Sequence, residues 1–181
     1  MHEEIIFSGF GGQGALFAGQ LLTYAALDEG KHVTWIPSYG PEMRGGTAHC
    51  TVVVSDEPIG SPLVRHPTAA VVLNLPSFEK YEPLVKPGGV LVYNSSLIEA
   101  QPDRDDVRYV AVPGNEIGEE LGNARQANVA LLGALVAATG ILPLDAVIRA
   151  LDNHLPERQR RFLESNKEAL RRGAACANAE R

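Results

Sequence analysis

Residues 9–14, GFGGQG, form the stretch whose residue types and spacing most clearly suggest chemistry. Gly9, Gly11 and Gly14 fit the pattern G-x-G-x-x-G, between a short apolar run that predicts a strand and a longer one that predicts a helix. Glycines at this spacing let the backbone approach a ligand, and the N–H groups of a helix N-terminus attract phosphate. The candidate cofactor-binding or interface residues of this turn are Gly9, Gly11, Gly12, Gln13 and Gly14.

Two other interpretations of the glycine turn stay open. Small residues at these positions also allow the first helix to pack closely on the sheet. A dinucleotide site is the other alternative, but it requires an Asp or Glu about twenty residues further on, at the end of the second strand. That strand ends in TWIPSYG, without an acid. Gly12 and Gln13 add a polar tip that packing does not require, so we expect a ligand or a partner to rest against the turn.

A second loop, residues 38–46, is dense in glycine and proline and carries charged and aromatic side chains. Arg44 is suited to recognise a carboxylate, a phosphate or a partner chain through its guanidinium group, and a solvated pair with Glu42 is the alternative. Because both loops follow the first two strands, we expect them to be neighbours at one edge of the sheet. The candidate residues of this loop are Ser38, Tyr39, Gly40, Pro41, Glu42, Met43, Arg44, Gly45 and Gly46.

No catalytic or metal-binding set is predicted. His49 and Cys50 are adjacent on a predicted strand, so their side chains point to opposite faces of the sheet. Ser8 lies outside any G-x-S-x-G motif. The two cysteines, Cys50 and Cys176, are too few for an iron–sulfur cluster and are not spaced for structural zinc.

The elements that must position these residues predict an α/β fold. The expected fold has three layers, α/β/α, around a mostly parallel mixed sheet; it begins with a Rossmann-like strand, glycine turn and helix, and ends in a helical C-terminal part. We expect one domain spanning residues 1–181. Strands are expected at 5–7, 31–36, 47–55, 68–75, 87–94 and 107–114. Helices are expected at 15–27, near 77–85 with Ser77 as the cap, at 123–139, at 143–155 and at 156–179.

Charge and hydropathy restrict the partners. The formal net charge of −6 argues against nucleic acid and an acidic membrane, and the absence of a basic leader or a long apolar run predicts a cytoplasmic chain. The segment 123–139 is apolar on most sides, so it is either central to the core or in contact with another subunit. The segment 156–179 mixes signs at helical spacing, which is typical of a solvated, salt-bridged face; an interaction arm is the alternative. Its charged residues are Glu157, Arg158, Arg160, Arg161, Glu164, Lys167, Glu168, Arg171 and Arg172.

Taken together, three stretches carry a family resemblance. GFGGQG, then SYGPEMRGGTAHCTVVVSDEPIGSP, then NVALLGALVAATG closely resemble the gamma subunit of 2-oxoacid:ferredoxin oxidoreductases. The segment YGPEMRGG is the most distinctive, and the likeness continues to NKEALRRG near the end of the chain. Pyruvate, 2-oxoglutarate, branched-chain and indolepyruvate enzymes share this domain, so the resemblance leaves the oxoacid open.

The resemblance implies a division of labour among subunits. Such complexes decarboxylate a 2-oxoacid with thiamine diphosphate and magnesium, pass electrons through iron–sulfur clusters to ferredoxin, and transfer the acyl group to coenzyme A. The alpha and beta subunits hold thiamine diphosphate, and the beta subunit and a ferredoxin-like delta subunit hold the clusters. We therefore expect this chain to bind none of these cofactors alone, to have an assembly role with a contact on the coenzyme A side, and to be able to form a homodimer when isolated. A free-standing dinucleotide-binding oxidoreductase is the alternative, and a pure scaffold is the third.

Overall fold

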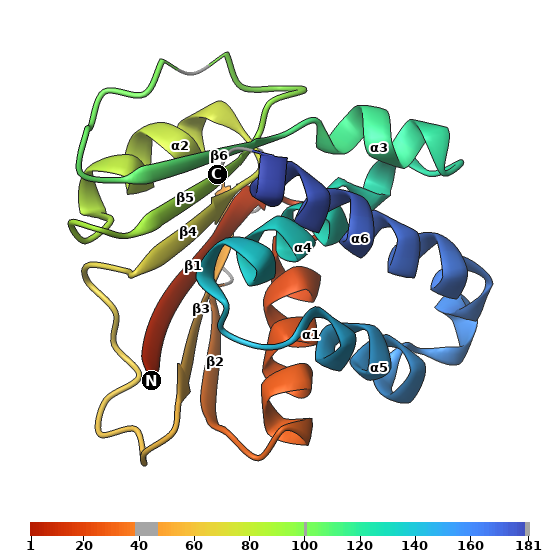
Figure 1. Ribbon diagram of the computed structural model, residues 1–181, viewed down its shortest axis with the longest axis horizontal. Helices are drawn as coiled ribbons and strands as arrows, with labels where there is room; N and C mark the ends of the chain where they lie inside the picture. Colours follow the sequence, from red (N-terminus) through yellow and green to blue (C-terminus); the bar gives the residue numbers. More distant parts are fainter. Residues whose placement is uncertain (39–46, 100, 180–181) are drawn as a thin grey trace.

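The computed structural model describes residues 1–38, 47–99 and 101–179. Among these residues, a twisted sheet has α2 (Leu75–Tyr81) on one face, and the other helices lie on or beyond the opposite face (Figure 1). The three-layer α/β/α fold expected from the sequence is confirmed, with most of the helical mass on one side.

The sheet has six strands in the order β2-β3-β1-β4-β5-β6. β1 and β4–β6 form three parallel pairs, whereas β3 is antiparallel to both of its neighbours. The mostly parallel mixed sheet is thus confirmed. The strands are β1 (His2–Phe10), β2 (His32–Ser38), β3 (Thr47–Ser55), β4 (Ala69–Val72), β5 (Val90–Asn94) and β6 (Arg108–Val112).

β3 lies between the first two strands, which the sequence does not reveal. β2 runs in the same direction as β1, as expected for a β-α-β unit, but His49 of β3 pairs with Ser8 on one side and with Ser38 on the other. The ends of β1 and β2 share one edge of the sheet with a strand between them. A dinucleotide site of the Rossmann type uses adjacent first and second strands. The inserted strand therefore removes the main support for the dinucleotide alternative.

Two crossovers place the helices. α1 (Ala15–Asp28) connects β1 to β2 across one face, and α2 connects β4 to β5 across the opposite face. The prediction of Ser77 as the cap of α2 is wrong. Asn74 caps this helix by accepting a hydrogen bond from the Ser77 N–H at 2.9 Å, and the Ser77 hydroxyl instead lies 2.8 Å from the Ser8 hydroxyl. Asn and Ser are comparable caps, so the choice depends on the tertiary contact that occupies the Ser77 hydroxyl.

The C-terminal part is helical as expected, and it differs from the prediction in two places. The segment expected as one helix from residue 156 opens as a 3₁₀ helix, Glu157–Phe162, and continues as α6 (Leu163–Ala179). A short helix, α3 (Gly114–Glu120), was not predicted. The remaining helices are α4 (Ala127–Thr139), which follows a 3₁₀ turn at Ala124–Gln126 and ends at Gly140, and α5 (Leu144–His154).

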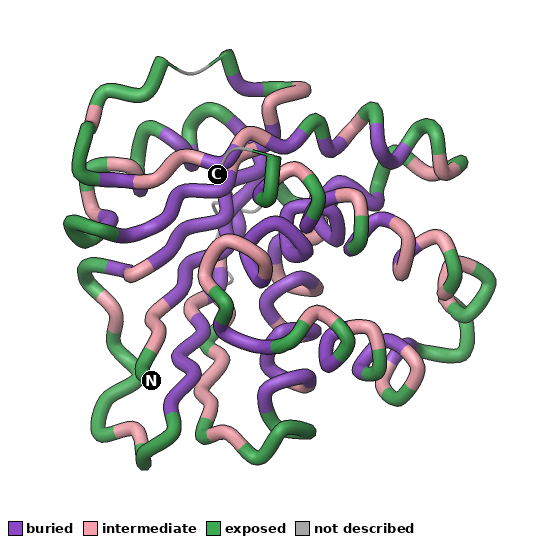
Figure 2. Tube along the Cα trace, in the orientation of Figure 1, coloured by how far each residue is buried: buried purple, intermediate pink, exposed green. Residues whose placement is uncertain are grey.

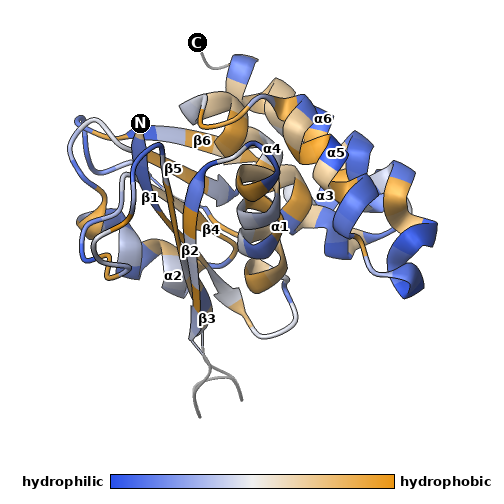
Figure 3. Ribbon diagram, turned by 90° about the horizontal axis from the view of Figure 1, so that it is seen from below, coloured by the Kyte–Doolittle hydropathy of each residue, from blue (hydrophilic) through white to orange (hydrophobic). Residues whose placement is uncertain are grey.

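α4 forms the centre of the larger core. Its residues from Ala127 to Val136 are all buried, and it lies between the sheet and α6 (Figure 2). The apolar helices α1 and α4 face the sheet, while more hydrophilic surfaces of α5 and α6 lie outside them (Figure 3). Of the two interpretations of segment 123–139, the core role is the one this packing supports.

The salt-bridged face expected for segment 156–179 is present in part. Lys167 pairs with Asp152 at 2.8 Å, and Arg172 pairs with Glu120 at 2.6 Å and with Glu168 at 3.3 Å. Within the ranges described above, none of the helices combines the length and apolar character needed to cross a membrane.

Candidate functional site

The glycine turn is held rigidly between β1 and α1. Gly12 and Gly14 have φ of +90° and +82°, a region that favours glycine. The Phe10 N–H donates to Gln13 Oε1 at 2.7 Å, and the Gln13 N–H donates to the Phe10 carbonyl at 3.1 Å. The turn therefore keeps one shape without help from a ligand.

Gln13 has an internal role rather than forming a polar tip. Its amide donates to the Leu73 carbonyl and accepts from Asn74, both at 3.4 Å, which ties the turn to the end of β4. A Cβ on Gly9 would lie 2.9 Å from the Leu73 Cβ, so close packing accounts for this glycine. Gly11 and Gly12 are exposed, and they remain the positions of the turn open to a ligand or partner.

Gly14→Ala is expected to cost more stability than the same change at a matched glycine. Gly14 and Gly30 both have positive φ, so each alanine costs about 1–2 kcal/mol of backbone strain. A Cβ on Gly14 would also lie 2.3 Å from Asn128 Nδ2 and displace an amide that donates to the Gly14 carbonyl at 3.0 Å, whereas Gly30 has open space. Thermal unfolding should show a Tm loss for Gly14→Ala at least about twice that for Gly30→Ala. Equal losses would contradict the role assigned to Asn128.

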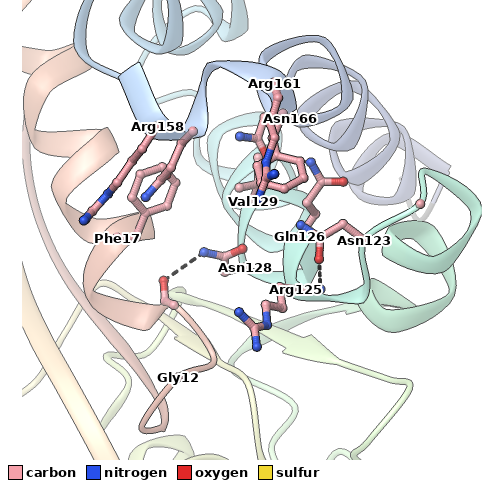
Figure 4. A pocket seen from close by; sticks show the side chains of 14 residues that line it. Gly12, Phe17, Asn123, Arg125, Gln126, Asn128, Val129, Arg158, Arg161 and Asn166 are labelled. Carbon is pink, nitrogen blue, oxygen red and sulfur yellow. Dashed lines mark hydrogen bonds between the residues drawn. The ribbon is translucent and has the colours of Figure 1, made fainter. Parts of the chain in front are cut away.

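A cavity of about 690 Å³ lies beside the turn (Figure 4). Its volume is in the range of small-molecule sites. Asn128 reaches from its wall to the glycine turn (Figure 4). The lining residues are Gly12, Gly14, Phe17, Gly122, Asn123, Arg125, Gln126, Asn128, Val129, Arg158, Gln159, Arg161, Phe162 and Asn166.

The N-terminal ends of three helices meet at this cavity. Gly14 and Phe17 come from the start of α1, Asn128 from the first turn of α4, and Asn166 from the first turn of α6. Helix N-termini carry partial positive charge and unsatisfied N–H groups. Neither α1 nor α4 has an acidic residue in its first turn to neutralise that charge. At α1 and α4 the partial positive charge is therefore not offset by a first-turn acid, whereas α6 carries Glu164 in its first turn.

Three arginines add full positive charges. Arg125, Arg158 and Arg161 line the cavity and form no ion pair with a carboxylate in the part of the chain that the structure describes. The lining contains no Asp or Glu. The arginines that do pair with carboxylates are Arg104, Arg149, Arg160, Arg171 and Arg172. In a chain of net charge −6, these three guanidinium groups lie together where an anion can enter.

Buried amides form the wall of the cavity next to α6. Gln126 is 3% exposed and donates to Ser165 Oγ at 2.6 Å and to Asn166 Oδ1 at 2.8 Å. Its Oε1 has no hydrogen-bond partner among the described residues. The Gln126 amide is thus held in the wall by Ser165 and Asn166, and its oxygen is buried away from the open space of the cavity.

Two smaller hollows adjoin the cavity and extend it into a groove. One of about 180 Å³ shares Gly12 and Arg125 with it and continues to Leu73 and Leu97, at the ends of β4 and β5. It occupies the point where the strand order reverses around β1 and β4, where ligands bind in open α/β sheets. The other, of about 260 Å³, shares Phe17, Arg158 and Gln159 with the cavity and lies between α1 and α5.

The candidates of loop 38–46 are only partly placed. Ser38 ends β2 at the same edge of the sheet as the glycine turn. Tyr39, Gly40, Pro41, Glu42, Met43, Arg44, Gly45 and Gly46 lie outside the described residues. Their contact with a ligand or partner stays a prediction.

His49 and Cys50 point to opposite faces of the sheet, as expected. The His49 ring lies 6.1 Å from the Tyr81 ring of α2, while the Cys50 thiol lies 3.7 Å from the Ala15 carbonyl of α1. Burial raises the pKa of the Cys50 thiol to about 12, so the thiolate is a minor species at neutral pH. Among the described residues, no three His, Cys, Asp or Glu side chains are grouped so that they could hold a metal ion.

The sequence pattern did not point to the three arginines of the cavity. Arg158 and Arg161 were assigned to a solvated, salt-bridged face, and Arg125 was not singled out. A signal was present, because Arg125 lies in the 3₁₀ turn that leads into α4, and Arg158 and Arg161 lie in the 3₁₀ helix that leads into α6. The helix dipole favours acidic residues near the N-terminus of a helix, so basic residues there do not stabilise the helix and instead indicate a binding role.

Comparisons with known proteins agree with this fold. The family model "Pyruvate ferredoxin/flavodoxin oxidoreductase" matches residues 4–176. Ketoisovalerate oxidoreductase subunit VorA of Methanothermobacter marburgensis is 44% identical over 142 residues, which cover 78% of this chain and 29% of VorA. 2-Oxoglutarate synthase subunit KorC of Methanocaldococcus jannaschii is 38% identical over 161 residues, which cover 87% of this chain and 86% of KorC.

Solved structures of related proteins have the same fold as this chain. The gamma subunit of the keto/oxoacid ferredoxin oxidoreductase of Geobacter sulfurreducens superposes with a TM-score of 0.83 at 34% identity, covering 98% of this chain and 99% of that one. 2-Oxoglutarate:ferredoxin oxidoreductase of Magnetococcus marinus, solved with 2-oxoglutarate, coenzyme A and succinyl-CoA bound, gives a TM-score of 0.86 at 24% identity. It covers 98% of this chain and 31% of that chain, and at this identity the likeness concerns the fold alone.

The chain belongs to the pyruvate ferredoxin/flavodoxin oxidoreductase family. The resemblance drawn from its sequence motifs is therefore confirmed. Its relatives are subunits of oxidoreductases for ketoisovalerate, 2-oxoglutarate and pyruvate. The chain spans 29% of the length of the VorA subunit and most of the length of KorC.

Proposed function

We propose that this chain is the gamma component of a thiamine diphosphate-dependent 2-oxoacid:ferredoxin oxidoreductase. The single observation that carries the proposal is the family match over residues 4–176. The near-complete mutual coverage with the Geobacter sulfurreducens gamma subunit supports it. The complex would oxidatively decarboxylate a 2-oxoacid to an acyl-CoA and carbon dioxide and reduce ferredoxin.

Within that complex, the chain binds and positions rather than catalyses. Its groove offers guanidinium groups, helix N-termini and amides, which are groups that recognise an anion. Magnesium prefers carboxylate oxygens, which the cavity lining lacks, so the thiamine diphosphate–magnesium unit does not fit this cavity. The proposal assigns that unit to the alpha and beta subunits and the iron–sulfur clusters to the beta and delta subunits.

Coenzyme A is the ligand that fits the groove. It is a long molecule with a diphosphate and a phosphate on its ribose, and the groove is long and lined by three unpaired arginines. Arg125, Arg161 and the glycine turn would hold the phosphates, and the hollow by Leu73 and Leu97 would lead the thiol arm to the carboxyl edge of the sheet. Coenzyme A in the Magnetococcus marinus complex supports the choice of ligand.

The carboxyl edge of the sheet is the proposed contact with the other subunits. Phe10, Leu75 and Leu97, which follow or end β1, β4 and β5, are 42%, 44% and 49% exposed. Large apolar side chains exposed together at one edge favour an interface. Loop 38–46, including Arg44, leaves β2 at this same edge and is proposed to contribute to the contact.

Co-expression with candidate alpha, beta and delta subunits tests this proposal. The wild-type chain should co-purify with them, and turnover of a 2-oxoacid should require it. Phe10→Glu with Leu97→Glu should reduce co-purification at least about tenfold, because two charges would be buried in the contact. Leu63→Glu is the matched control. Leu63 is 76% exposed and lies in the connection between β3 and β4, at the edge of the sheet away from the glycine turn. Turnover that is the same without the chain would overturn the proposal.

A further inference from the structure

β2 is the outer strand of the sheet, and its outer side has no partner strand among the described residues. None of its seven residues is fully buried, whereas six of the nine residues of β3 beside it are. An exposed edge presents a row of N–H and C=O groups to which another chain can add a strand, and charged side chains are the usual protection against this. β2 contains no Lys, Arg, Asp or Glu. Its composition therefore favours an edge that a partner covers.

The alternation of the backbone identifies the groups that point outward from β2. The Asp56 N–H donates to the Met1 carbonyl at 3.0 Å, so the backbone of Asp56 points toward β1. Counting back along β3, every second residue bonds to β1 and the others bond to β2, as an antiparallel ladder requires. On β2 this leaves the N–H and C=O groups of Val33 and Trp35 pointing outward. Pro37 follows in the same alternation, where its missing N–H removes no bond to β3.

An apolar stripe of α1 adjoins this edge. Leu16 and Leu27 are about three helical turns apart, so they lie on one stripe of the helix. The stripe lies between Gly19, which packs against Cys50 of β3, and Tyr24, which stacks on α5. Leu27 is 50% exposed, and α1 runs beside β2 (Figure 1, Figure 3). The stripe and the outer side of β2 together form an edge strip along the side of the protein.

A second copy of this chain fits the edge strip because the outward groups are complementary to themselves. With a two-fold axis through Thr34, perpendicular to the sheet, Val33 of each copy lies opposite Trp35 of the other, and the two residues exchange both backbone hydrogen bonds. A β-branched residue opposite an aromatic one is a favourable cross-strand pair. The same axis places both α1 helices on one face of the joined sheet. Because β2 has no acidic side chain, two chains of net charge −6 do not bring like charges together along it.

The size of the edge strip suits a dimer. Seven strand residues span about 23 Å, and a helix layer on a sheet is roughly 20 Å thick. Each copy therefore buries roughly 500 Å², and the pair buries about 1,000 Å², which is the lower limit for a specific interface. We expect a dimer that dissociates on dilution.

We propose that two copies of this chain pair antiparallel through β2, about a two-fold axis at Thr34, so that their sheets form one continuous sheet. The inference goes beyond the proposed function, since it requires neither a ligand nor the other subunits. The homodimer expected from the sequence had no assigned surface, and the outer side of β2 provides one. Pairing there leaves the carboxyl edge, with Phe10 and Leu97, to the other subunits.

Sedimentation of the full chain at several concentrations tests the pairing. Wild type should have twice the mass of one chain at high concentration and dissociate on dilution. Thr34→Lys and Thr34→Glu should each raise the dissociation constant at least about tenfold, because like charges meet at the axis. An equimolar mixture of the two variants should recover the dimer, which misfolded chains would not do. Monomer at every concentration, a dimer that both variants retain, or no recovery in the mixture would overturn the inference.

A cysteine at the axis tests the register. In a non-hydrogen-bonded antiparallel pair the two Cα atoms are about 4.5 Å apart, within the range of a disulfide. Thr34→Cys should therefore cross-link under copper phenanthroline beyond the level of wild type, which has Cys50 and Cys176. Ile36→Cys is the matched control, because Ile36 lies on the same face of β2, is 42% exposed, and would face His32 of the second copy. Equal cross-linking of the two variants would overturn the inference.

Co-purification separates a second copy from another occupant of the edge. If the isolated chain is a monomer and Thr34→Lys reduces co-purification with the alpha, beta and delta subunits, then β2 receives a strand of another subunit and the inference falls. The proposed function stands in that case, because its own test is turnover that requires the chain.

Discussion

Gly173→Ala should destabilise the protein by about 3 kcal/mol, lowering Tm by about 6–12 °C. A Cβ at this position of α6 would lie 1.7 Å from the Ala130 carbonyl oxygen of α4. One turn away on each helix, a Cβ on Gly133 would lie 2.1 Å from the Leu170 carbonyl oxygen. Both obstacles are backbone atoms of helices, which cannot rotate aside. The helices would have to separate, and the helix propensity that alanine gains over glycine, about 1 kcal/mol, does not offset that loss.

The matched control for this change is Ala175→Ser. Ala175 lies on the same helix but is exposed, and serine adds one heavy atom, as Gly173→Ala does. Urea unfolding followed by circular dichroism should place the control within about 0.5 kcal/mol of wild type. If the free energies of unfolding of the two variants agree, α4 and α6 are not in backbone contact, and the support of the cavity by their N-terminal ends would need another explanation.

Arg161→Ala and Arg125→Ala should each raise KM for coenzyme A about 10- to 100-fold in the assembled complex, with kcat nearly unchanged. Each removes a guanidinium group that lines the cavity and has no competing carboxylate in the described residues. The phosphates lie far from the reacting thiol, so these contacts are equal in the ground state and the transition state, and their loss appears in KM. Raising the salt concentration should weaken coenzyme A binding less in the variants than in wild type.

Arg171→Ala controls for the loss of one positive charge. Arg171 is exposed on α6 and pairs with Glu168 at 3.6 Å, outside the cavity lining. KM for the 2-oxoacid should be unchanged in all three variants. A fall in kcat with no change in KM for coenzyme A would show that the arginines act on assembly or catalysis rather than on the ligand.

Much of the fold could be predicted because hydrophobic periodicity and glycine positions are local signals. The buried run TAAVVLNL indicated an internal strand, and β4 lies between β1 and β5. The place of β3 between β1 and β2 could not be predicted, since strand order depends on contacts between distant segments. The cap of α2 was misassigned because Asn74 and Ser77 are both good caps, and only the tertiary contact of Ser77 with Ser8 decides between them.

Of the candidate site, only the part formed by residues adjacent in the sequence could be singled out from the sequence. The glycine turn is contiguous in sequence, and the structure places it beside the cavity. Arg125, Arg158 and Arg161 come from separate segments that meet only after α4, α5 and α6 pack together. In the sequence, Arg161 stands four residues after Glu157 and suggests a helical ion pair, whereas in the structure Glu157 pairs with Arg160.

The most direct test of the central claim is an experimental structure of the assembled complex with coenzyme A. We expect density for the coenzyme A phosphates within hydrogen-bond distance of Arg125 and Arg161, beside the glycine turn, with the thiol arm leaving toward Leu97. Coenzyme A held by the other subunits, with these arginines facing solvent or protein carboxylates, would contradict it.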